Sequence, residues 1–231
     1  MSEPEPLRLG LVGSTGLVGW TLMEALVGRE DFRLIALSRR EVKLPRGARM
    51  EMRLAQPSQW PEVVTQTNLD ILVCALGTTW EKAGRDEAAF REVDEKLVLS
   101  VAKAAREAGV RHFIFVSSAG ANPLAKNLYL RVKGEVEKAL IKLRFTRLDI
   151  LRPGLIRGRR EGDPRLLEGI GILLAPVADL FLHGRRRRYR SIAVGTLIDA
   201  ILGLAHEKAG GRFVHEHDGL VFAARRHEGK H

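Results

Sequence analysis

Apolar runs and amphipathic segments alternate along the chain up to residue 151. Five apolar runs predict buried strands, at residues 8–12, 32–37, 69–76, 112–117 and 145–151. Residues 49–54 alternate between polar and apolar side chains, which predicts a sixth, half-exposed strand. Apolar residues at helical spacing predict helices between the strands, at residues 17–27, 58–67, 86–108 and 129–143. This alternation is typical of an α/β fold with a doubly wound parallel sheet.

The pattern becomes less regular after Pro153. Helices are predicted at residues 166–182 and 194–206, and short strands at residues 212–215 and 220–223. With 231 residues and 45% hydrophobic side chains, the chain is long enough for one substantial core. We therefore interpret residues 1–231 as a single Rossmann-type domain, in which residues from about 155 to 231 form a small C-terminal cap on the substrate side.

A glycine-rich turn, Gly13-Ser-Thr-Gly16-Leu-Val-Gly19, joins the first predicted strand to the first predicted helix. Gly13 permits the tight turn, Gly16 lets the backbone approach a pyrophosphate, and Gly19 lets the helix pack close to the strand. The N-terminus of the helix offers free N–H groups to phosphate oxygens. The alternative is a turn used only for packing. The cofactor-binding residues that the turn predicts are Gly13, Ser14, Thr15, Gly16, Leu17, Val18 and Gly19.

The second predicted strand ends in Ser38-Arg39-Arg40. An NAD site usually places an acidic residue here to bind the ribose 2′-hydroxyl, whereas two guanidiniums suit the 2′-phosphate of NADP. Ser38 would add a hydroxyl to the same site. The sequence therefore favours NADP(H) over NAD(H). The alternative is that Arg39 and Arg40 only begin a solvated loop.

Tyr129 and Lys133 lie four residues apart on a predicted helix, so their side chains share one face. A free phenol has a pKa of ~10, too high for a base at neutral pH, and a neighbouring ammonium stabilises the phenolate. Such a pair can exchange a proton with an alcohol or carbonyl while a nicotinamide exchanges a hydride. Ser117 and Ser118 end the preceding strand, where a hydroxyl can orient the substrate oxygen. The alternative for Tyr129 is a half-buried packing residue.

A single cysteine, Cys74, lies in the apolar run at residues 69–76, where a buried strand residue is expected. One cysteine forms no intramolecular disulfide, and the acidic N-terminus lacks the layout of a signal peptide. We therefore expect a cytoplasmic protein. Scattered histidines and one thiol predict no metal site. The apolar stretch at residues 166–182 is too short and too charged to span a membrane.

The net charge is 38 − 28 = +10, and the C-terminal third is the more basic part, around Arg185–Arg188. Both a solvated loop and a phosphate-bearing or acidic partner are compatible with this run. Aromatic side chains are sparse beside it, so we do not expect nucleic-acid binding. Contact with an anionic membrane surface stays a minor alternative.

Further motifs follow in order along the chain. They are Ala75-Leu-Gly-Thr-Thr79, Lys82-Ala-Gly84, Val116-Ser-Ser-Ala-Gly-Ala-Asn122, Tyr129-Leu-Arg-Val-Lys-Gly-Glu135 and Leu151-Arg-Pro-Gly154. Together with the glycine turn and Ser38-Arg39-Arg40, they make the chain resemble an atypical short-chain dehydrogenase/reductase. More narrowly, it resembles the Tat-interacting oxidoreductase-like proteins and the NmrA-like group.

The resemblance implies a role for each matching position. Tyr129 would be the proton donor or acceptor, Lys133 its partner, and Ser118 or Ser117 the group that orients the substrate oxygen. Positions implied to line the cofactor, besides the glycine turn and the two arginines, are Leu76, Gly77, Thr78, Tyr129, Lys133, Pro153, Leu155 and Ile156. Two positions depart from the pattern: Val93-Asp94 stands where many extended relatives have Val-Asn, and Arg53-Leu54-Ala55 lacks an acidic residue that often helps to hold adenine.

The leading hypothesis is therefore an NADP-dependent oxidoreductase that acts on a small carbonyl or alcohol substrate. The chief alternative is an NADPH-binding regulatory or redox-sensing protein without turnover, because the same residues would persist as cofactor ligands. The C-terminal loops would set the substrate pocket. Their arginines, which suggest an anionic or polar substrate, are Arg157, Arg159, Arg160 and Arg165.

Overall fold

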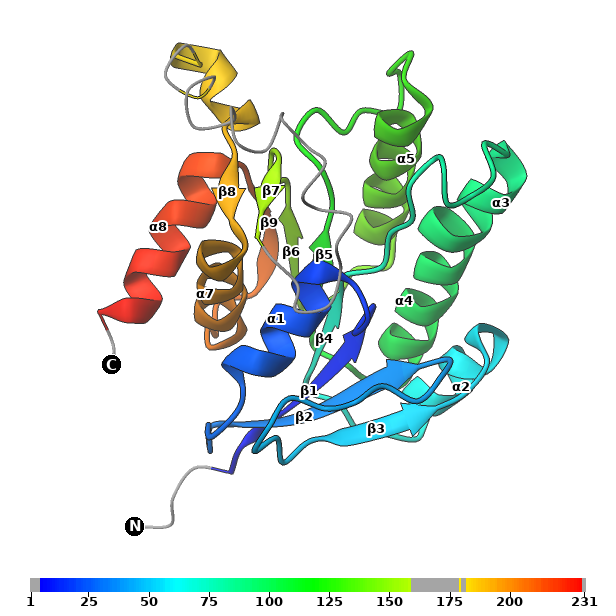
Figure 1. Cartoon of the computed structure of the whole chain (residues 1–231), viewed down its shortest axis with the longest axis vertical. Coiled ribbons are helices and arrows are strands. Elements are labelled where there is room, and N and C mark those ends of the chain that lie inside the picture. Colours follow the sequence, from blue (N-terminus) through cyan, green and yellow to red (C-terminus); the bar gives the residue numbers. More distant parts are fainter. Residues whose placement is uncertain (1–4, 159–178, 180–181, 230–231) are drawn as a thin grey trace.

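The computed structural model describes residues 5–158, 179 and 182–229. Its main strands are β1 (Leu7–Val12), β2 (Phe32–Ser38), β3 (Glu51–Leu54), β4 (Ile71–Cys74), β5 (His112–Val116), β6 (Arg147–Leu151) and β9 (Gly211–His215). They form one sheet in the order β3-β2-β1-β4-β5-β6-β9, and every neighbouring pair is parallel (Figure 1). Two short strands, β7 (Ile156–Arg157) and β8 (Ile192–Ala193), pair separately. The predicted α/β fold with a doubly wound parallel sheet is confirmed.

Helices cover both faces of the sheet (Figure 1). They are α1 (Leu17–Ala25), α2 (Trp60–Thr65), α3 (Glu87–Arg91), α4 (Val98–Glu107), α5 (Leu128–Lys142), α7 (Val194–Ala205) and α8 (His217–Glu228), with the 3₁₀ turns η1 (Pro57–Gln59) and η4 (Gly184–Tyr189). Leu22, Leu197 and Leu220 pack α1, α7 and α8 against one face. Val64, Val101 and Val136 pack α2, α4 and α5 against the other. The carboxyl ends of the strands meet at one edge of the sheet, where parallel folds place their ligands.

The long helix predicted at residues 86–108 is three segments. Asp86 caps α3 by accepting a hydrogen bond from the backbone of Ala89, a π-helical turn η2 spans Glu92–Leu97, and α4 follows it. Gly109 has a φ of +83°, which ends the helix in a left-handed conformation that glycine adopts without strain. π-helical turns inside helices are frequent at functional sites.

Within the described residues, one element predicted in the C-terminal region is contradicted by the structure. The short strand predicted at residues 220–223 is wrong, because these residues lie inside α8. The buried side chains of α8 are Leu220, Ala223, Ala224 and His227, at the helical spacing of three and four residues. The predicted strand at residues 212–215 is β9, which joins the main sheet next to β6. The helix predicted at residues 166–182 lies, apart from Asp179 and Leu182, outside the described residues.

A buried charge network joins β5, β6 and β9. Asp149 is fully buried, and its carboxylate lies 2.7 Å from His112 Nε2, 2.6 Å from His215 Nε2 and 2.6 Å from Arg147 Nε. Burial alone would raise the pKa of the Asp149 carboxyl, yet hydrogen bonds from His112, His215 and Arg147 hold that pKa well below its ordinary value. The carboxylate therefore stays ionised and ties three neighbouring strands together.

Candidate functional site

A cleft of about 690 Å³ opens at the carboxyl ends of β1, β2 and β4. The structure brings together there three of the predicted cofactor segments. They are the first half of the glycine turn (Gly13–Gly16), the end of β2 (Ser38–Arg40) and the loop after β4 (Leu76–Thr78). Pro57, Trp60 and Lys82 are among the further lining residues, and the sequence had not assigned them to the site.

The glycine turn has the geometry of a nucleotide cradle. A Cβ on Gly13, whose φ is +95°, would lie 2.5 Å from the carbonyl oxygen of Ala75, and a Cβ on Gly19 would lie 2.2 Å from that of Gly13. Both glycines are thus required by packing. A Cβ on Gly16 would lie 3.5 Å from its nearest neighbour, so Gly16 borders open space. No side chain caps the N-terminus of α1 at Gly16, which leaves backbone N–H groups for an anion.

Two predicted cofactor hydroxyls are used inside the protein. Ser14 donates its hydroxyl hydrogen to the carbonyl of Leu37 at 3.1 Å. Ser38 donates to the carbonyl of Arg40 at 2.7 Å, which shapes the turn that carries Arg39 and Arg40. Both arginines are exposed. The described residues that line the cleft include three cations, Arg39, Arg40 and Lys82, and no carboxylate.

The Tyr129/Lys133 pair lies on the first turns of α5. Asn127 caps this helix by accepting a hydrogen bond from the backbone of Leu130. The Lys133 ammonium lies 5.8 Å from the centre of the Tyr129 ring and 3.4 Å from the carbonyl oxygen of Leu76, which lines the cleft. Tyr129 is 37% exposed, and its hydroxyl makes no hydrogen bond within the described residues. The lysine therefore connects the tyrosine to the wall of the cleft.

Asp94 is a site residue that the sequence reasoning noted only as a departure from the family pattern. It is fully buried in η2, lies 2.9 Å from Lys133 Nζ, and accepts a hydrogen bond from the backbone N–H of Thr78 at 2.7 Å. Burial lowers the pKa of Lys133, but the charge and hydrogen bond of Asp94 together with the neighbouring Tyr129 and Cys74 outweigh it, so that pKa stands above its ordinary value. The signal in the sequence was a carboxylate on the buried helix stripe between Phe90 and Val98.

The two candidate serines have different environments. Ser117 donates its hydroxyl hydrogen to Glu137, a buried carboxylate that is also held by Arg152, with Arg152 Nε 3.0 Å from Glu137 Oε1. The only hydrogen bond of the Ser118 hydroxyl within the described residues is a long one, 3.4 Å to the carbonyl of Ala119. Ser118 is therefore the serine whose hydroxyl is open to a substrate. Glu137 follows Lys133 by four residues, a spacing that would have placed it on the Tyr129 face.

The remaining predicted positions do not line the cleft. Ala119 donates a backbone hydrogen bond to Pro153 at 2.8 Å, which sets the loop after β6 beside the serine turn. Leu155 is half exposed, and Ile156 is in β7. Leu17, Val18 and Gly19 belong to α1 and do not line the cleft. Among the arginines of the C-terminal loops, Arg157 is half-buried, and Arg159, Arg160 and Arg165 lie outside the described residues.

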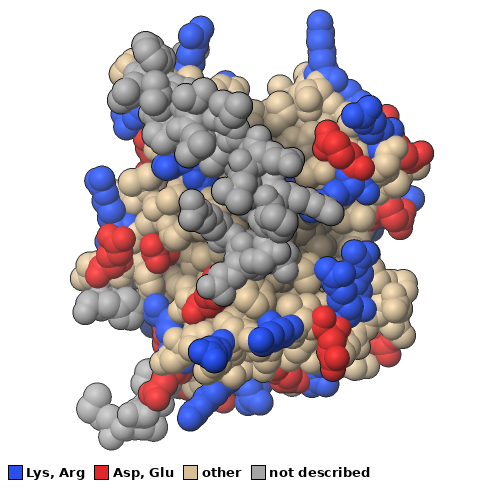
Figure 2. Space-filling view, in the orientation of Figure 1, with Lys and Arg blue, Asp and Glu red and all other residues tan. Residues whose placement is uncertain are grey.

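The basic run lies close to the serine turn. The ring of Tyr189 would be 3.3 Å from a Cβ on Gly120, and the backbone of Tyr189 and Arg190 lies against Gly154. Arg187 forms an ion pair of 3.1 Å with Asp218. Figure 2 shows basic and acidic side chains interspersed over the described part of the visible face, without one continuous basic area. Among the described helices, none is both long and apolar enough to cross a membrane.

Comparison with known proteins places this geometry in context. A family model described as NAD(P)H-binding matches residues 13–171. The protein FMP52-1, mitochondrial, of Scheffersomyces stipitis is 34% identical over 75% of this chain and 76% of its own length. The protein FMP52, mitochondrial, of Eremothecium gossypii is 39% identical over 65% of this chain and 67% of its own length.

Solved structures share the fold at low sequence identity. MoeE5 in complex with UDP-glucose and NAD has a TM-score of 0.68 at 14% identity, over 90% of this chain and 74% of that chain. The dTDP-4-dehydrorhamnose reductase of Bacillus anthracis in complex with NADP has a TM-score of 0.67 at 16% identity, over 99% of this chain and 82% of that chain. These structures show the fold and bind either NAD or NADP, so they do not decide between the two cofactors.

The expected cytoplasmic location is wrong by this comparison, because the curated relatives are named as mitochondrial proteins. The expectation rested on the single cysteine and on the N-terminus without a signal-peptide layout. Both features separate secreted proteins from proteins of reducing compartments, and neither separates the cytosol from the mitochondrial interior.

Proposed function

The chain belongs to the NAD(P)H-binding family, and on that premise we propose that it is an NADP-dependent oxidoreductase of the short-chain dehydrogenase/reductase type. The substrate is a small carbonyl or alcohol compound. The observation that carries the proposal is the position of Lys133, whose ammonium lies next to the ring of Tyr129 and also contacts the Leu76 carbonyl in the wall of the cleft. The chain acts as one unit, since β9 from its C-terminal region completes the main sheet.

Tyr129, Ser118 and Lys133 each have a separate role at the reacting carbonyl. Bound NADPH would supply the hydride. The Tyr129 hydroxyl donates a proton to the substrate oxygen in reduction and accepts one in oxidation, and the Ser118 hydroxyl hydrogen-bonds to the same oxygen. The Lys133 ammonium stabilises the phenolate that remains on Tyr129 after reduction. Small-molecule substrates are also found with the structural relatives, one of which binds UDP-glucose.

The preference for NADP rests on the charges around the cleft. Replacing Arg39 and Arg40 together with serine is expected to weaken NADPH binding roughly 10- to 100-fold and to change NADH binding less than about threefold, because the lost hydrogen bonds are to the 2′-phosphate. Fluorescence titration with each nucleotide measures both constants. Arg33→Ser, at an exposed arginine near the start of β2 that does not line the cleft, is the control. Equal losses for the two nucleotides would remove the argument for NADP.

The two serines give a second prediction. Ser118→Ala is expected to lower the turnover number roughly 10- to 100-fold without changing thermal stability, because it removes one hydrogen bond to the reacting oxygen. Ser117→Ala is expected to lower the free energy of unfolding by about 1.5–3 kcal/mol, because it removes a buried donor to the Glu137 carboxylate. Steady-state kinetics and urea unfolding of both variants check the pair. If Ser117→Ala lowers turnover and Ser118→Ala lowers stability, then Ser117 and not Ser118 is the serine that contacts the substrate oxygen.

Turnover distinguishes this proposal from a regulatory protein that only binds NADPH. A panel of aldehydes, ketones and quinones is added to protein with NADPH, and the loss of NADPH absorbance is followed. Oxidation of NADPH that depends on both protein and carbonyl supports the enzyme. Tight NADPH binding with no turnover of any carbonyl in the panel would favour the regulatory alternative, in which Tyr129 and Lys133 serve only as cofactor ligands.

A further inference from the structure

Asp94 contacts two parts of the site at once. One carboxylate oxygen lies 2.9 Å from Lys133 Nζ, and the other accepts the backbone N–H of Thr78, which lines the cofactor cleft. Gly77 lies beside this ion pair, since a Cβ on it would be 3.6 Å from the Asp94 carboxylate and 3.8 Å from Lys133 Nζ. A single buried side chain thus joins the cleft wall to the lysine beside Tyr129.

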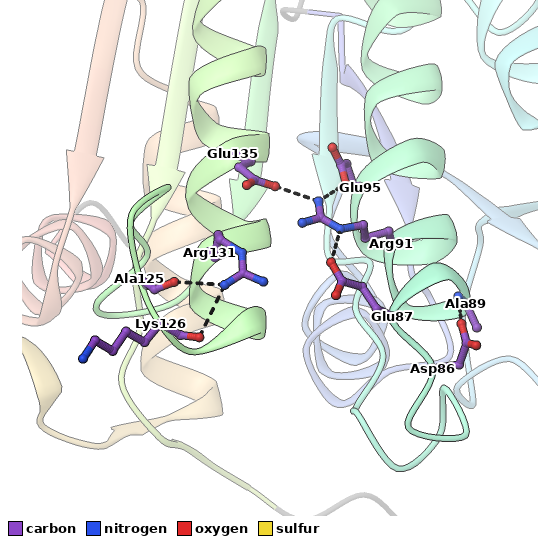
Figure 3. A network of polar contacts seen from close by, with 9 residues as sticks. All are labelled: Asp86, Glu87, Ala89, Arg91, Glu95, Ala125, Lys126, Arg131 and Glu135. Carbon is purple, nitrogen blue, oxygen red and sulfur yellow. Dashed lines mark hydrogen bonds and ion pairs between the residues drawn. The ribbon is translucent and has the colours of Figure 1, made fainter.

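The segment that carries Asp94 is held against α5. Arg91 pairs with Glu87 and Glu95 on its own segment and with Glu135 on α5 at 2.7 Å (Figure 3). These partners, Glu135 foremost, raise the pKa of Arg91 further above its ordinary value, so the guanidinium stays charged in this contact. Lys133 is also on α5, two residues before Glu135. The Arg91–Glu135 ion pair therefore joins the segment around Asp94 to the helix that carries Lys133.

The charge on Lys133 depends on Asp94. The ionisable groups that face the ammonium are Asp94 from η2, Tyr129 from α5 and Cys74 from β4, and the Phe115 ring of β5 lies 5.1 Å away. The Cys74 thiol is fully buried, and burial raises its pKa to about 11, so it stays neutral. Asp94 is therefore the carboxylate that pairs with this fully buried ammonium, and its charge is the largest of the contributions that raise the pKa of Lys133.

We propose that Asp94 is a positioning residue that holds the Lys133 ammonium, charged, against the cofactor cleft while it fixes the Gly77–Thr78 backbone on the other side. The binding of the cofactor in the cleft and the charge of the catalytic lysine therefore both depend on the Asp94 carboxylate. This inference rests on the proposed function for the role of Lys133, and it is tested by cofactor binding so that it does not depend on turnover.

The test replaces Asp94 with asparagine, which is nearly the same size and still accepts a hydrogen bond from Thr78. The dissociation constant for NADPH is measured from about pH 7 to about pH 9.5. Without the carboxylate, burial lowers the pKa of Lys133, so its ammonium is lost as the pH rises. We expect wild-type affinity to vary less than about threefold across the range, and Asp94→Asn to lose roughly tenfold or more at its alkaline end.

Glu92→Gln is the matched control, because it makes the same acid-to-amide change in the same π-helical turn, at an exposed residue paired with Lys96. It is expected to match wild type at every pH. The proposal is overturned if the NADPH affinity of Asp94→Asn is unchanged, or if it falls by the same factor at every pH. A carboxylate with only a structural role would give a loss of affinity that does not depend on pH.

A second variant keeps the test valid if Asp94→Asn does not fold. The double variant Asp94→Asn/Lys133→Met buries no unpaired charge, and we expect it to bind NADPH roughly tenfold more weakly than wild type at every pH. Wild-type affinity in the double variant would overturn the proposal. Alkaline loss of NADPH binding in Asp94→Asn, together with a wild type that turns over no carbonyl, would contradict the enzyme and leave the role of Asp94 intact.

Discussion

Replacing Tyr129 with phenylalanine is expected to lower the turnover number by roughly 10²- to 10⁴-fold, the range for loss of a general acid or base. The change removes only the hydroxyl. The ring keeps its edge-to-face contact with Phe90, with ring centres 6.1 Å apart, so the fold and the cleft are retained. NADPH affinity is expected to stay within about threefold of wild type. Steady-state kinetics and nucleotide titration measure the two effects separately.

The second tyrosine of the chain provides a matched control for this change. The ring of Tyr189 lies beside Gly120, which belongs to the turn that follows Ser117 and Ser118. Tyr189→Phe makes the same substitution near the same site and is expected to change the turnover number less than about threefold. A Tyr129→Phe variant that retains wild-type turnover would show that proton transfer at this site uses another group.

Asp149→Asn is expected to lower the free energy of unfolding by about 3–5 kcal/mol at neutral pH. The substitution leaves the buried Arg147 and His112 and the partly buried His215 around a neutral amide, without the carboxylate that now pairs with them. Asp31→Asn is the control, because Asp31 is also paired with an arginine and a histidine but is about a third exposed. Solvent screening limits its expected effect to about 1 kcal/mol.

The effect of Asp149 is expected to depend on pH in one direction. Its pKa is depressed in the folded protein, so its stabilisation is complete above the unfolded pKa of ~3.9 and is lost as the pH falls through the lower folded value. Urea unfolding at a series of pH values should show the difference between wild type and Asp149→Asn shrink below about pH 4. A difference that is constant with pH would mean that the effect comes from packing.

The fold was predictable where local pattern and global structure agree. Buried parallel strands are continuous apolar runs, and the runs at residues 112–117 and 145–151 correspond to β5 and β6. The C-terminal element was not predictable in the same way. Residues 220–223 read as a short strand in isolation, and their helical state becomes clear only with the buried Ala224 and His227 that complete the face of α8 on α7.

The lining of the cleft was predictable where a motif acts through its own backbone, and contacts between side chains of different elements were not. The first half of the glycine turn (Gly13–Gly16) and Arg39/Arg40 line one cleft, where the sequence predicts the cofactor. The sequence left Ser117 and Ser118 equivalent, because the partner that distinguishes them, Glu137, comes from a different element. The sequence shows Asp94 as an acidic residue within an apolar helix stripe. Its contact with Lys133 was not predictable, because it depends on the packing of η2 against α5.

The most direct test of the central claim is transfer of deuterium from NADPH labelled at the nicotinamide C4 position. The protein is incubated with labelled NADPH and each aldehyde or ketone of the panel, and the alcohols are analysed by mass spectrometry. We predict an alcohol that carries deuterium on the former carbonyl carbon, formed in equal amount with NADP and absent from the Tyr129→Phe variant. Bound NADPH with no deuterium in any product would contradict the assignment of this protein as an oxidoreductase.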